Sequence, residues 1–389
     1  MPSLQQTIQW LRSLIAFPSV SSTSNADVSE RAGELLDSLG FQVEQTEYLD
    51  ARGLRKVNLI ARRDPFKSHP NTHGGLAYFC HTDVVPADGW TGPGGDPFEG
   101  VVQGNKLFGR GSCDMKGSLA TMLAAAAEFS SPQQVAPLWI VCTADEEVGF
   151  DGAKHLVRDS SGYRELVQMQ PLAIIGEPTG LSVVHAHKGI TGCNIISRGR
   201  AAHSSTTDGI NANEAMVPML QTLLEIGEQT KVDRSYHDDR FDPPTLSWNF
   251  GVSDHCDAVN ITPHRSVAWF SLRPMPEIDG EDLIARAEAR AQSLGLDFQR
   301  FAGGGTSWID TDAVCIRTLC ELAGTSPHTV CYGTDGGEFK ELHQRVVLGP
   351  GDIAQAHTTD EWIDLEQIRQ GTELYKKVIH RWCIDPQPM

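Results

Sequence analysis

Side chains that could bind a cation or move a proton follow short apolar runs of the sequence, either within a few residues or, for His357, after a Gly/Pro loop. The apolar runs are 74–80, 138–143, 172–175 and 346–348. The polar residues that follow them, in chain order, are His81, Asp83, Asp145, Glu146, Glu147, Glu177 and His357. Imidazole and carboxylate groups in this number suit metal binding and proton transfer.

His81 and Asp83 stand two residues apart in the stretch HTDVVP. At the end of a strand, residues at this spacing point to the same side. We therefore expect the carboxylate of Asp83 to accept the second N–H of the imidazole and to leave the other ring nitrogen for a metal. An ordinary polar strand end is the alternative.

Asp145, Glu146 and Glu147 are three consecutive acids, which repel one another unless a cation relieves them. Adjacent residues project differently, so one could bind a metal while its neighbour faces a water molecule. The alternative is a solvated acidic turn. Glu177, restricted by the following Pro178, and His357 in a Gly/Pro loop could equally be a turn residue and a surface histidine.

Asp114 lies in the middle of GRGSCDMKG, residues 109–117. A run rich in Ala, Leu and Met follows from Gly117 and predicts a buried helix. Asp114 is thus expected just outside a helix N-terminus, where an N-cap is the simplest role for an aspartate.

Taken together, the candidates predict a metal site. Two imidazoles and three carboxylates suit a pair of zinc ions that share one bridging carboxylate and have one His and one further carboxylate each. Such a pair polarises a carbonyl group and activates water. The candidate ligands are His81, Asp114, Glu147, Glu177 and His357. Glu146 is then left over as the base for that water.

The elements that must position these residues are predicted to form an α/β fold. Residues 1–50 read as two helices followed by a strand, and the four apolar runs read as buried strands separated by helices. This is typical of a mostly parallel sheet covered on both faces, in which ligands sit at the carboxyl ends of the strands.

The middle of the chain has a different order of predicted elements. Residues 183–301 read as β-α-β-β-α-β, which indicates a ferredoxin-like α+β unit. At 389 residues, two domains are expected. We place a catalytic metal-binding domain at 1–181 and 303–389, and an inserted lid and dimerisation domain at 182–302.

Composition excludes several classes of function. The formal charge of -18 argues against a nucleic-acid-binding surface, and no apolar run is long enough to span a membrane. The nine Cys residues form no CxxC pair, and the N-terminus lacks the features of a signal peptide. We therefore expect free thiols in a reducing compartment, the cytoplasm.

The order and spacing of six motifs resemble one family. The motifs are HTDVVP, GRGSCDMKG, DEEVG, GEPT, GRAAHSS and LGPGDIAQAHTTDE. They are similar to those of the di-zinc metallopeptidases, a family that includes aminoacylases, succinyl-diaminopimelate desuccinylase and glutamate carboxypeptidase. The resemblance covers nearly the whole chain.

The resemblance implies a role for each matching residue. His81 and Glu177 would bind one zinc ion, Glu147 and His357 the other, and Asp114 would bridge them, with Co²⁺ able to substitute. Asp83 would orient His81, and Glu146 would be the general acid/base. The peptide bond between Asp114 and Met115 would be cis.

The inserted domain would also contribute to the reaction. The resemblance implies that His203 stabilises the developing oxyanion, commonly across the interface of a homodimer. Asn260 and Arg273 would contact the substrate, and the guanidinium of Arg273 suits an α-carboxylate. A strand salt bridge is the plainer role for Arg273.

The implied activity is hydrolysis of the amide bond of a small N-acyl amino acid. The GINANEA and PGDIAQAH stretches are most similar to the branch that deacetylates N-acetyl-L-ornithine, in arginine biosynthesis. Asp335 and Glu338 could meet a cationic side chain, although this segment, 331–339, matches the family only loosely and could simply be a helical turn.

Several alternatives remain open from the sequence. Succinyl-diaminopimelate desuccinylation and dipeptidase or carboxypeptidase activity would use the same site. A non-catalytic metal-binding scaffold would not need Glu146. Nucleotide binding at GNKLFGRG lacks the required glycine spacing and the phosphate-loop Lys-Ser/Thr pair.

Overall fold

The computed structural model describes residues 3–66 and 74–386 and divides into two compact units. The first unit comprises Met1–Ala186, Ser307–His328 and Thr334–Met389. The second comprises His187–Thr306 and Thr329–Gly333. The insertion expected at 182–302 therefore differs by four or five residues at each end from the second unit, which also takes in the short segment Thr329–Gly333.

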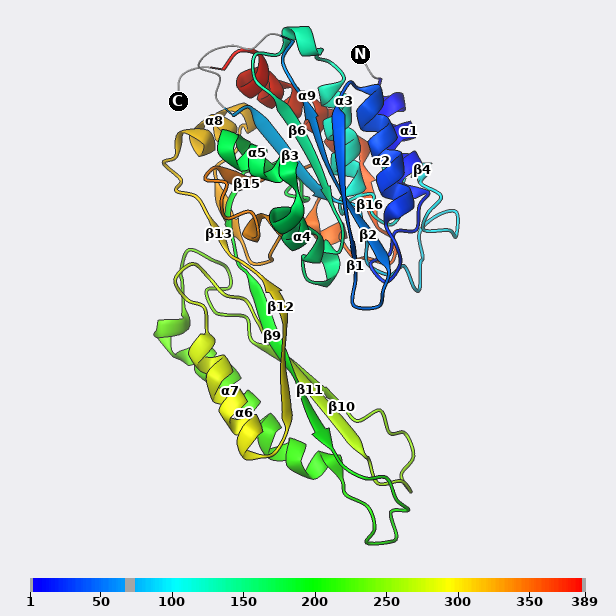
Figure 1. Cartoon of the computed structure of the whole chain (residues 1–389), viewed down its shortest axis with the longest axis vertical. Helices are drawn as coiled ribbons and strands as arrows, with labels where there is room; N and C mark the ends of the chain where they lie inside the picture. Colours follow the sequence, from blue (N-terminus) through cyan, green and yellow to red (C-terminus); the bar gives the residue numbers. More distant parts are fainter. Residues whose placement is uncertain (1–2, 67–73, 387–389) are drawn as a thin grey trace. The chain divides into compact units, whose positions relative to one another are not determined.

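The first unit is built on a mixed sheet with a parallel centre (Figure 1). Its strands run in the spatial order β1 (Gln42–Leu49), β2 (Arg55–Arg63), β6 (Leu138–Thr143), β3 (Leu76–His81), β7 (Leu172–Ile175), β15 (Arg345–Val347), β8 (Val184–His187) and β13 (Ser307–Trp308), with β14 (His328–Val330) paired to β8. β6, β3, β7 and β15 are mutually parallel. These four strands are the four apolar runs, so their carboxyl ends meet at one edge as expected.

The flanking strands are antiparallel, which the sequence did not predict. β1 pairs with β2, β2 with β6, and β15 with β8, all antiparallel. A strand that follows its neighbour through a short turn, as β2 follows β1, can only pair antiparallel, because a parallel pair needs a long crossover.

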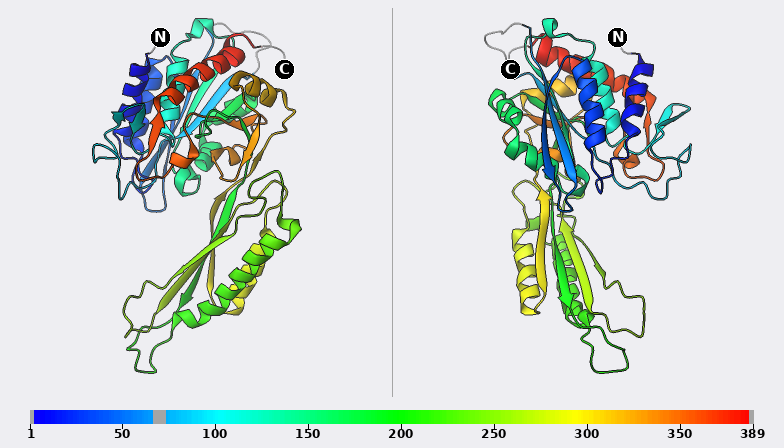
Figure 2. Two further views of the ribbon diagram at one scale, coloured as in Figure 1. Left: turned by 180° about the vertical axis from the view of Figure 1, so that it is seen from behind. Right: turned by 45° about the vertical axis from the view of Figure 1, so that its right-hand side comes forward.

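Helices cover both faces of this sheet. Their bounds are α1 (Leu4–Ile15), α2 (Ala26–Ser38), α3 (Lys116–Ala126), α4 (Asp151–Asp159), α5 (Ser161–Met169), α8 (Val314–Ala323) and α9 (Leu365–Ile379). Figures 1 and 2 show α2, α3 and α9 on one face, and α4 and α5 on the other. α3 is buried along its whole length, in keeping with its Ala-rich sequence.

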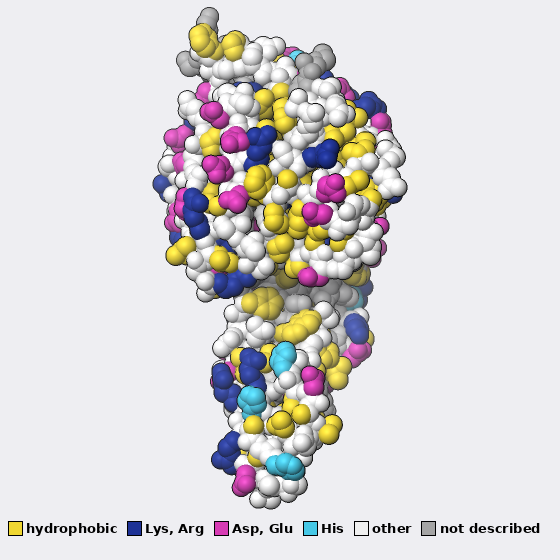
Figure 3. Space-filling view, turned by 90° about the vertical axis from the view of Figure 1, so that its right-hand side faces the viewer, with side chains coloured by type: hydrophobic (Ala, Val, Ile, Leu, Met, Phe, Trp, Pro, Cys, Tyr) yellow, Lys and Arg dark blue, Asp and Glu magenta, His cyan; other side chains and the backbone are white. Residues whose placement is uncertain are grey.

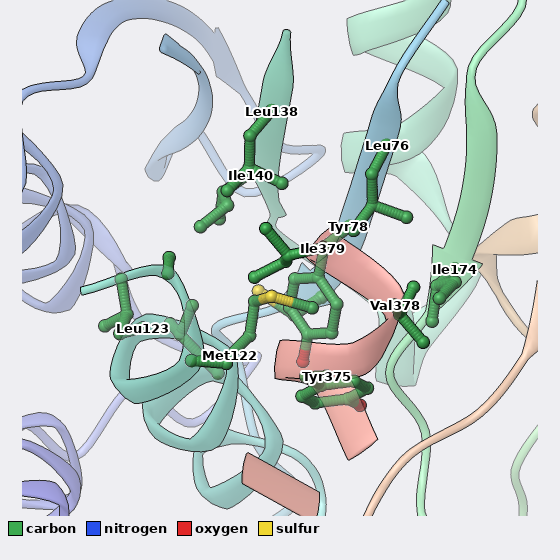
Figure 4. Close-up of a cluster of buried hydrophobic side chains, with 14 of the residues drawn as sticks. Leu76, Tyr78, Met122, Leu123, Leu138, Ile140, Ile174, Tyr375, Val378 and Ile379 are labelled. Atoms are coloured by element: carbon green, nitrogen blue, oxygen red, sulfur yellow. The ribbon is translucent and has the colours of Figure 1, made fainter. Parts of the chain in front are cut away.

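The core lies between the parallel strands and helices α3 and α9. Figure 4 shows Tyr78 of β3 and Ile140 of β6 facing Met122 of α3 and Tyr375 of α9. Tyr78 and Tyr375 both hydrogen-bond to Ser118, so the buried phenols are satisfied. This packing fixes α3, and hence the loop that precedes it.

A small second sheet holds two distant segments side by side. It runs β16 (Trp362–Asp364), β5 (Lys106–Phe108) and β4 (Val101–Gln103), all antiparallel. β5 leads directly into the loop 109–115, and β16 directly follows the loop that carries His357.

The second unit has the predicted β-α-β-β-α-β order. Its elements are β9 (Ile190–Arg198), α6 (Ala212–Val232), β10 (Asn249–Ser253), β11 (Arg265–Leu272), α7 (Glu281–Ser293) and β12 (Asp297–Gly304). The sheet order β10-β11-β9-β12 places the first and third strands in the centre, with α6 and α7 packed together (Figure 1). This is a ferredoxin-like arrangement.

The strand expected over 183–197 is interrupted. β8 ends at His187 and β9 begins at Ile190, and the two strands belong to different sheets. Between them, Gly189 packs so closely that an added Cβ would stand 2.5 Å from the carbonyl oxygen of Gly304. The apolar pattern alone does not reveal this change of sheet.

Among the described residues, no helix is both long and apolar enough to cross a membrane. On the face of the first unit shown in Figure 3, Asp and Glu side chains are interspersed with Lys and Arg.

Candidate metal centre

Three candidate ligands stand at the carboxyl edge of the parallel strands. His81 is the last residue of β3, and Glu177 follows β7 by two residues. Glu147 lies in a single 3₁₀ turn, η2 (Glu146–Val148), just after β6. Sheet register places His81 opposite Thr143, so the three segments leave the sheet next to one another.

Asp114 reaches this edge from the loop between β5 and α3. The N-cap of α3 is Met115, without a side-chain capping bond, so the N-cap interpretation of Asp114 is wrong. The Asp114–Met115 peptide bond is cis. Gly117 allows the loop to fold back on the helix start, because a Cβ there would meet the carbonyl oxygen of Ser112 at 2.1 Å.

The first ligand group consists of His81, Asp114 and Glu177. Nε2 of His81 lies 3.1 Å from Oδ1 of Asp114 and 3.9 Å from Oε1 of Glu177. All three residues are buried. Nδ1 of His81 lies 2.9 Å from the backbone carbonyl of Asp83, which can only accept, so Nδ1 carries the hydrogen and Nε2 is free to act as a ligand.

The second group consists of Asp114, Glu147 and His357. Nε2 of His357 lies 3.0 Å from Oε2 of Glu147 and 3.4 Å from Oδ2 of Asp114. The two carboxylate oxygens of Asp114 thus face different histidines. In each group the possible ligand atoms lie within 4.8 Å of one another, and Asp114 belongs to both groups.

The charges of these groups are strongly coupled. Hydrogen bonds to Asp114 and Glu147 raise the pKa of His357 to about 10. Burial lowers the pKa of His81, but hydrogen bonding to Asp114 and the proximity of Glu177 outweigh this and raise it. Burial raises the pKa of Asp114, yet its hydrogen bonds with both histidines hold it well below its usual range.

The pKa values of the remaining acids are raised, in contrast to that of Asp114. Burial, and then the negative charge of Glu177, raise the pKa of Glu146 well above its usual value. Burial and Asp114 raise the pKa of Glu147 and of Glu177. A cation bound nearby would favour the ionised forms of these carboxylates.

Asp83 acts on the turn that carries the two glutamates. Its carboxylate accepts the backbone N–H of Glu146 at 3.2 Å and that of Glu147 at 3.4 Å. Ser21 donates its hydroxyl to the same carboxylate at 2.7 Å. The expected contact between this carboxylate and His81 is longer, at 3.7 Å, so it is the backbone carbonyl of Asp83 that holds the imidazole.

A buried ion pair holds the residue that directly precedes the turn η2. Nζ of Lys56 lies 2.5 Å from Oδ1 of Asp145, and both side chains are buried. Tyr48 donates to the other carboxylate oxygen at 2.8 Å. Asp145 has a left-handed backbone (φ 56°), so the ion pair helps to hold the residue immediately before Glu146 in an unusual conformation.

Asp335 lies in the 3₁₀ turn η4 (Asp335–Gly337), next to the carboxyl end of β6. It is buried and accepts the hydroxyl of Thr143 at 2.5 Å, while its second carboxyl oxygen has no hydrogen-bond partner among the described residues. Burial raises its pKa to about 7. Glu338 follows this turn and is partly buried. No α-helix follows the turn in this segment.

The three remaining candidates belong to the second unit. His203 and Asn260 lie together, because His203 pairs with Ile261 in a β-bridge and the N–H of Ser204 donates to the carbonyl of Asn260. Arg273 follows β11 at its other end. The eight residues of β11 separate the two places by about 26 Å at ~3.3 Å per residue.

Sequence reasoning missed the residues that position the ligands. Glu361, Ser21 and Lys56 are buried polar side chains that bond to loops of the centre. Glu361 stands inside the recognised stretch HTTDE, which was a usable signal. Lys56 and Ser21 carry no such signal, because their partners are 89 and 62 residues away in the sequence.

The donor set fits a pair of zinc ions. It offers one imidazole nitrogen and carboxylate oxygens to each position, and it shares one carboxylate. Burial, and then the negative charge of neighbouring carboxylates, raise the pKa of Glu146, Glu147 and Glu177, and a bound cation would offset both effects.

Comparison with known proteins agrees with this arrangement. Residues 77–381 match the profile of peptidase family M20/M25/M40. An acetylornithine deacetylase of Myxococcus xanthus is 33% identical over 393 residues, covering 98% of each chain.

Solved structures share the fold at low identity. The dipeptidase Dug1p of Saccharomyces cerevisiae superposes with a TM-score of 0.77 at 17% identity, covering 98% of this chain and 97% of that one. The Bacillus subtilis protein YXEP, described as a dinuclear metal-binding peptidase, gives a TM-score of 0.60 at 13% identity, with 97% of each chain covered. The chain therefore belongs to peptidase family M20/M25/M40 and is an amidohydrolase.

Proposed function

We propose that this chain is a zinc-dependent deacylase of N-acyl amino acids whose preferred substrate is N-acetyl-L-ornithine, which it converts to L-ornithine and acetate. The observation that carries the proposal is that Asp114 belongs to two ligand groups while Glu146 remains beside them. Relatives 32 to 35% identical over nearly the whole chain are acetylornithine deacetylases, which supports the substrate; a place in arginine biosynthesis is part of the same proposal. The nine cysteines are free thiols, which supports the cytoplasm as the compartment.

The residues present would hold two zinc ions. His81 and Glu177 would bind one, Glu147 and His357 the other, and Asp114 would bind both. Bound there, the metals would supply Lewis-acid activation of the amide carbonyl and of water. Co²⁺ has similar ligand preferences and is expected to substitute.

Glu146 is the proposed proton carrier. Burial and the neighbouring Glu177 raise its pKa, so it accepts a proton more readily than an ordinary glutamate. It would take a proton from the attacking water and return it to the amide nitrogen, which leaves as the amine. Asp83 keeps the side chain in place through the backbone of the turn.

Asp335 is proposed to favour a cationic side chain such as that of ornithine, with Glu338 beside it. The support is a buried carboxyl oxygen of Asp335 that lies near His81 and has no hydrogen-bond partner in the part of the chain that the structure describes. A positively charged amine near this oxygen would favour its ionised form.

His203 and Asn260 of the second unit are proposed to contact the reacting amide, and Arg273 the α-carboxylate. Because about 26 Å separates Arg273 from the other two, one small substrate cannot touch all three in a single chain. This supports a homodimer in which one chain supplies His203 and Asn260 while its partner supplies Arg273.

The substrate assignment is tested by comparing kcat/KM of the zinc-loaded protein for four substrate classes. N-acetyl-L-ornithine should exceed N-acetylated neutral amino acids, succinyl-diaminopimelate and dipeptides. Asp335→Asn should reduce the preference for N-acetyl-L-ornithine over N-acetylated neutral amino acids. If a succinyl substrate or a dipeptide wins by tenfold, about 1.4 kcal/mol in the barrier, the assignment to acetylornithine fails.

A further inference from the structure

The carboxylate of Glu361 accepts hydrogen bonds from the backbone of the loop that carries Asp114. It accepts the N–H of Gly111 at 3.0 Å, of Cys113 at 2.8 Å and of Asp114 itself at 3.0 Å. Glu361 is fully buried. Three backbone N–H groups of this loop are thus held by one side chain that comes from a distant part of the sequence.

Arg110 completes the connection between this loop and the loop of His357. One guanidinium nitrogen donates to Glu361 at 2.6 Å, in an ion pair that is buried on both sides. The other donates to the carbonyl of Thr358, the residue directly after His357, at 3.0 Å, and to that of Pro86 at 3.2 Å. The backbone N–H of Gly109 also donates to the carbonyl of Glu361.

The two ligand groups depend on this connection to different degrees. His81 ends a strand and Glu177 closely follows one, so the parallel sheet itself sets their positions. His357 has a half-exposed side chain and a left-handed backbone (φ 65°) in a loop four residues before Glu361. Its distance to Asp114 is therefore set by whatever holds its loop against the loop 109–115.

We propose that Glu361 and Arg110 are positioning residues that couple the His357 loop to the Asp114 loop and thereby set the metal affinity of the second ligand group selectively. The inference rests on the proposed function only for the existence of two metal sites, not for the substrate. Glu361 binds no metal itself, because its oxygens already accept three backbone N–H groups and the guanidinium of Arg110.

The experiment is a calorimetric titration of metal-free protein with Zn²⁺, performed on the wild type and variants. Glu361→Gln keeps the shape of the side chain but places an amide NH₂ among groups that can only donate. Zn²⁺ binding to the second ligand group should weaken 10- to 100-fold, the usual effect of disturbing a residue that orients a ligand, while binding to the first group stays within about threefold. His357→Ala identifies which step belongs to the second group.

Hydrogen exchange provides a readout that needs no metal. In metal-free Glu361→Gln, the amides of Gly111, Cys113 and Asp114 should exchange at least tenfold faster, because they lose their charged acceptor. Asp360→Asn is the matched control, since Asp360 is the exposed neighbouring acid, and it should match the wild type in both measurements.

Arg110→Lys provides a second test if Glu361→Gln does not fold. Lysine keeps the charge but cannot reach Glu361 and Thr358 together. Zn²⁺ binding to the second ligand group should therefore weaken, but less than in Glu361→Gln. Unchanged binding in a folded variant, or equal weakening of both steps, would overturn the inference. A wild type that binds fewer than two zinc ions would remove the second site and the inference with it. A wild type that binds two but hydrolyses no N-acyl amino acid would contradict only the proposed function.

Discussion

At the scale of single residues, the centre is defined by buried acids that lie close together. Burial raises the pKa of Glu146, Glu147, Glu177 and Asp335, and the negative charges of neighbouring carboxylates add to this rise. Buried charges persist in proteins when they are paired or bound to metal. In the proposed function, two divalent ions bound at this centre would compensate the negative charge of its carboxylates.

The base assignment can be tested on Glu146. Glu146→Gln should retain both metals, because Glu146 belongs to neither ligand group. Turnover should fall by at least about 100-fold, the usual scale for a lost general acid/base. Metal content and kcat are measured together, with Glu165→Gln on the surface of α5 as the control. A rate near that of the wild type at full metal loading would show that another group moves the proton.

The ligand protons should leave when metal binds. His357, with its pKa raised to about 10, is protonated at pH 7 in the metal-free protein, and the raised pKa of Glu147 favours retention of a proton there too. Metal ligands must be deprotonated, so binding at pH 7 should release protons, and affinity should fall as pH falls. Titration calorimetry in buffers of different ionisation enthalpy measures the release. His357→Ala should release fewer protons, and equal release would contradict the assignment.

At the scale of elements, the sequence predicted the strands better than their surroundings. The apolar runs 138–143 and 172–175 coincide with β6 and β7, because fully buried parallel strands are marked by continuous apolar sequence. The turn η2 and the role of Asp83 in holding it were not predicted. They depend on a few hydrogen bonds between distant residues, which leave no periodic pattern in the sequence.

The ion pair between Lys56 and Asp145, which precedes the turn η2, is predicted to stabilise the protein. Lys56→Met leaves the carboxylate of Asp145 buried without its partner and should destabilise the protein by about 3–5 kcal/mol. The double variant Lys56→Met with Asp145→Asn should recover part of that loss, since the uncompensated charge is gone. Denaturant unfolding of the metal-free proteins measures both. A double variant whose loss equals the sum of the two single losses would show that the pair is not coupled.

At the scale of the whole molecule, the chain combines a metal-binding unit with a ferredoxin-like unit. The β-α-β-β-α-β order was readable from the sequence, whereas the joining segments were not. The segment Thr329–Gly333 joins the second unit although it lies far along the chain from the rest of it. No local pattern marks such a return.

The proposed homodimer can be tested by complementation. His203→Ala and Glu146→Gln chains should each have low activity alone. If His203 serves the metal centre of the partner chain, a mixed dimer contains one site with both residues intact, and some activity should return on mixing. Verified mixed dimers with no recovery would show that His203 acts within its own chain.

The central claim is that Asp114 joins two metal sites, and anomalous X-ray diffraction at the zinc edge tests it most directly. Crystals of the zinc-loaded protein should show two peaks about 3.5–4 Å apart on either side of the Asp114 carboxylate, the usual spacing in two-metal sites. One peak should lie against His81 and Glu177 and the other against Glu147 and His357. A single peak, or two peaks that do not share Asp114, would contradict the account.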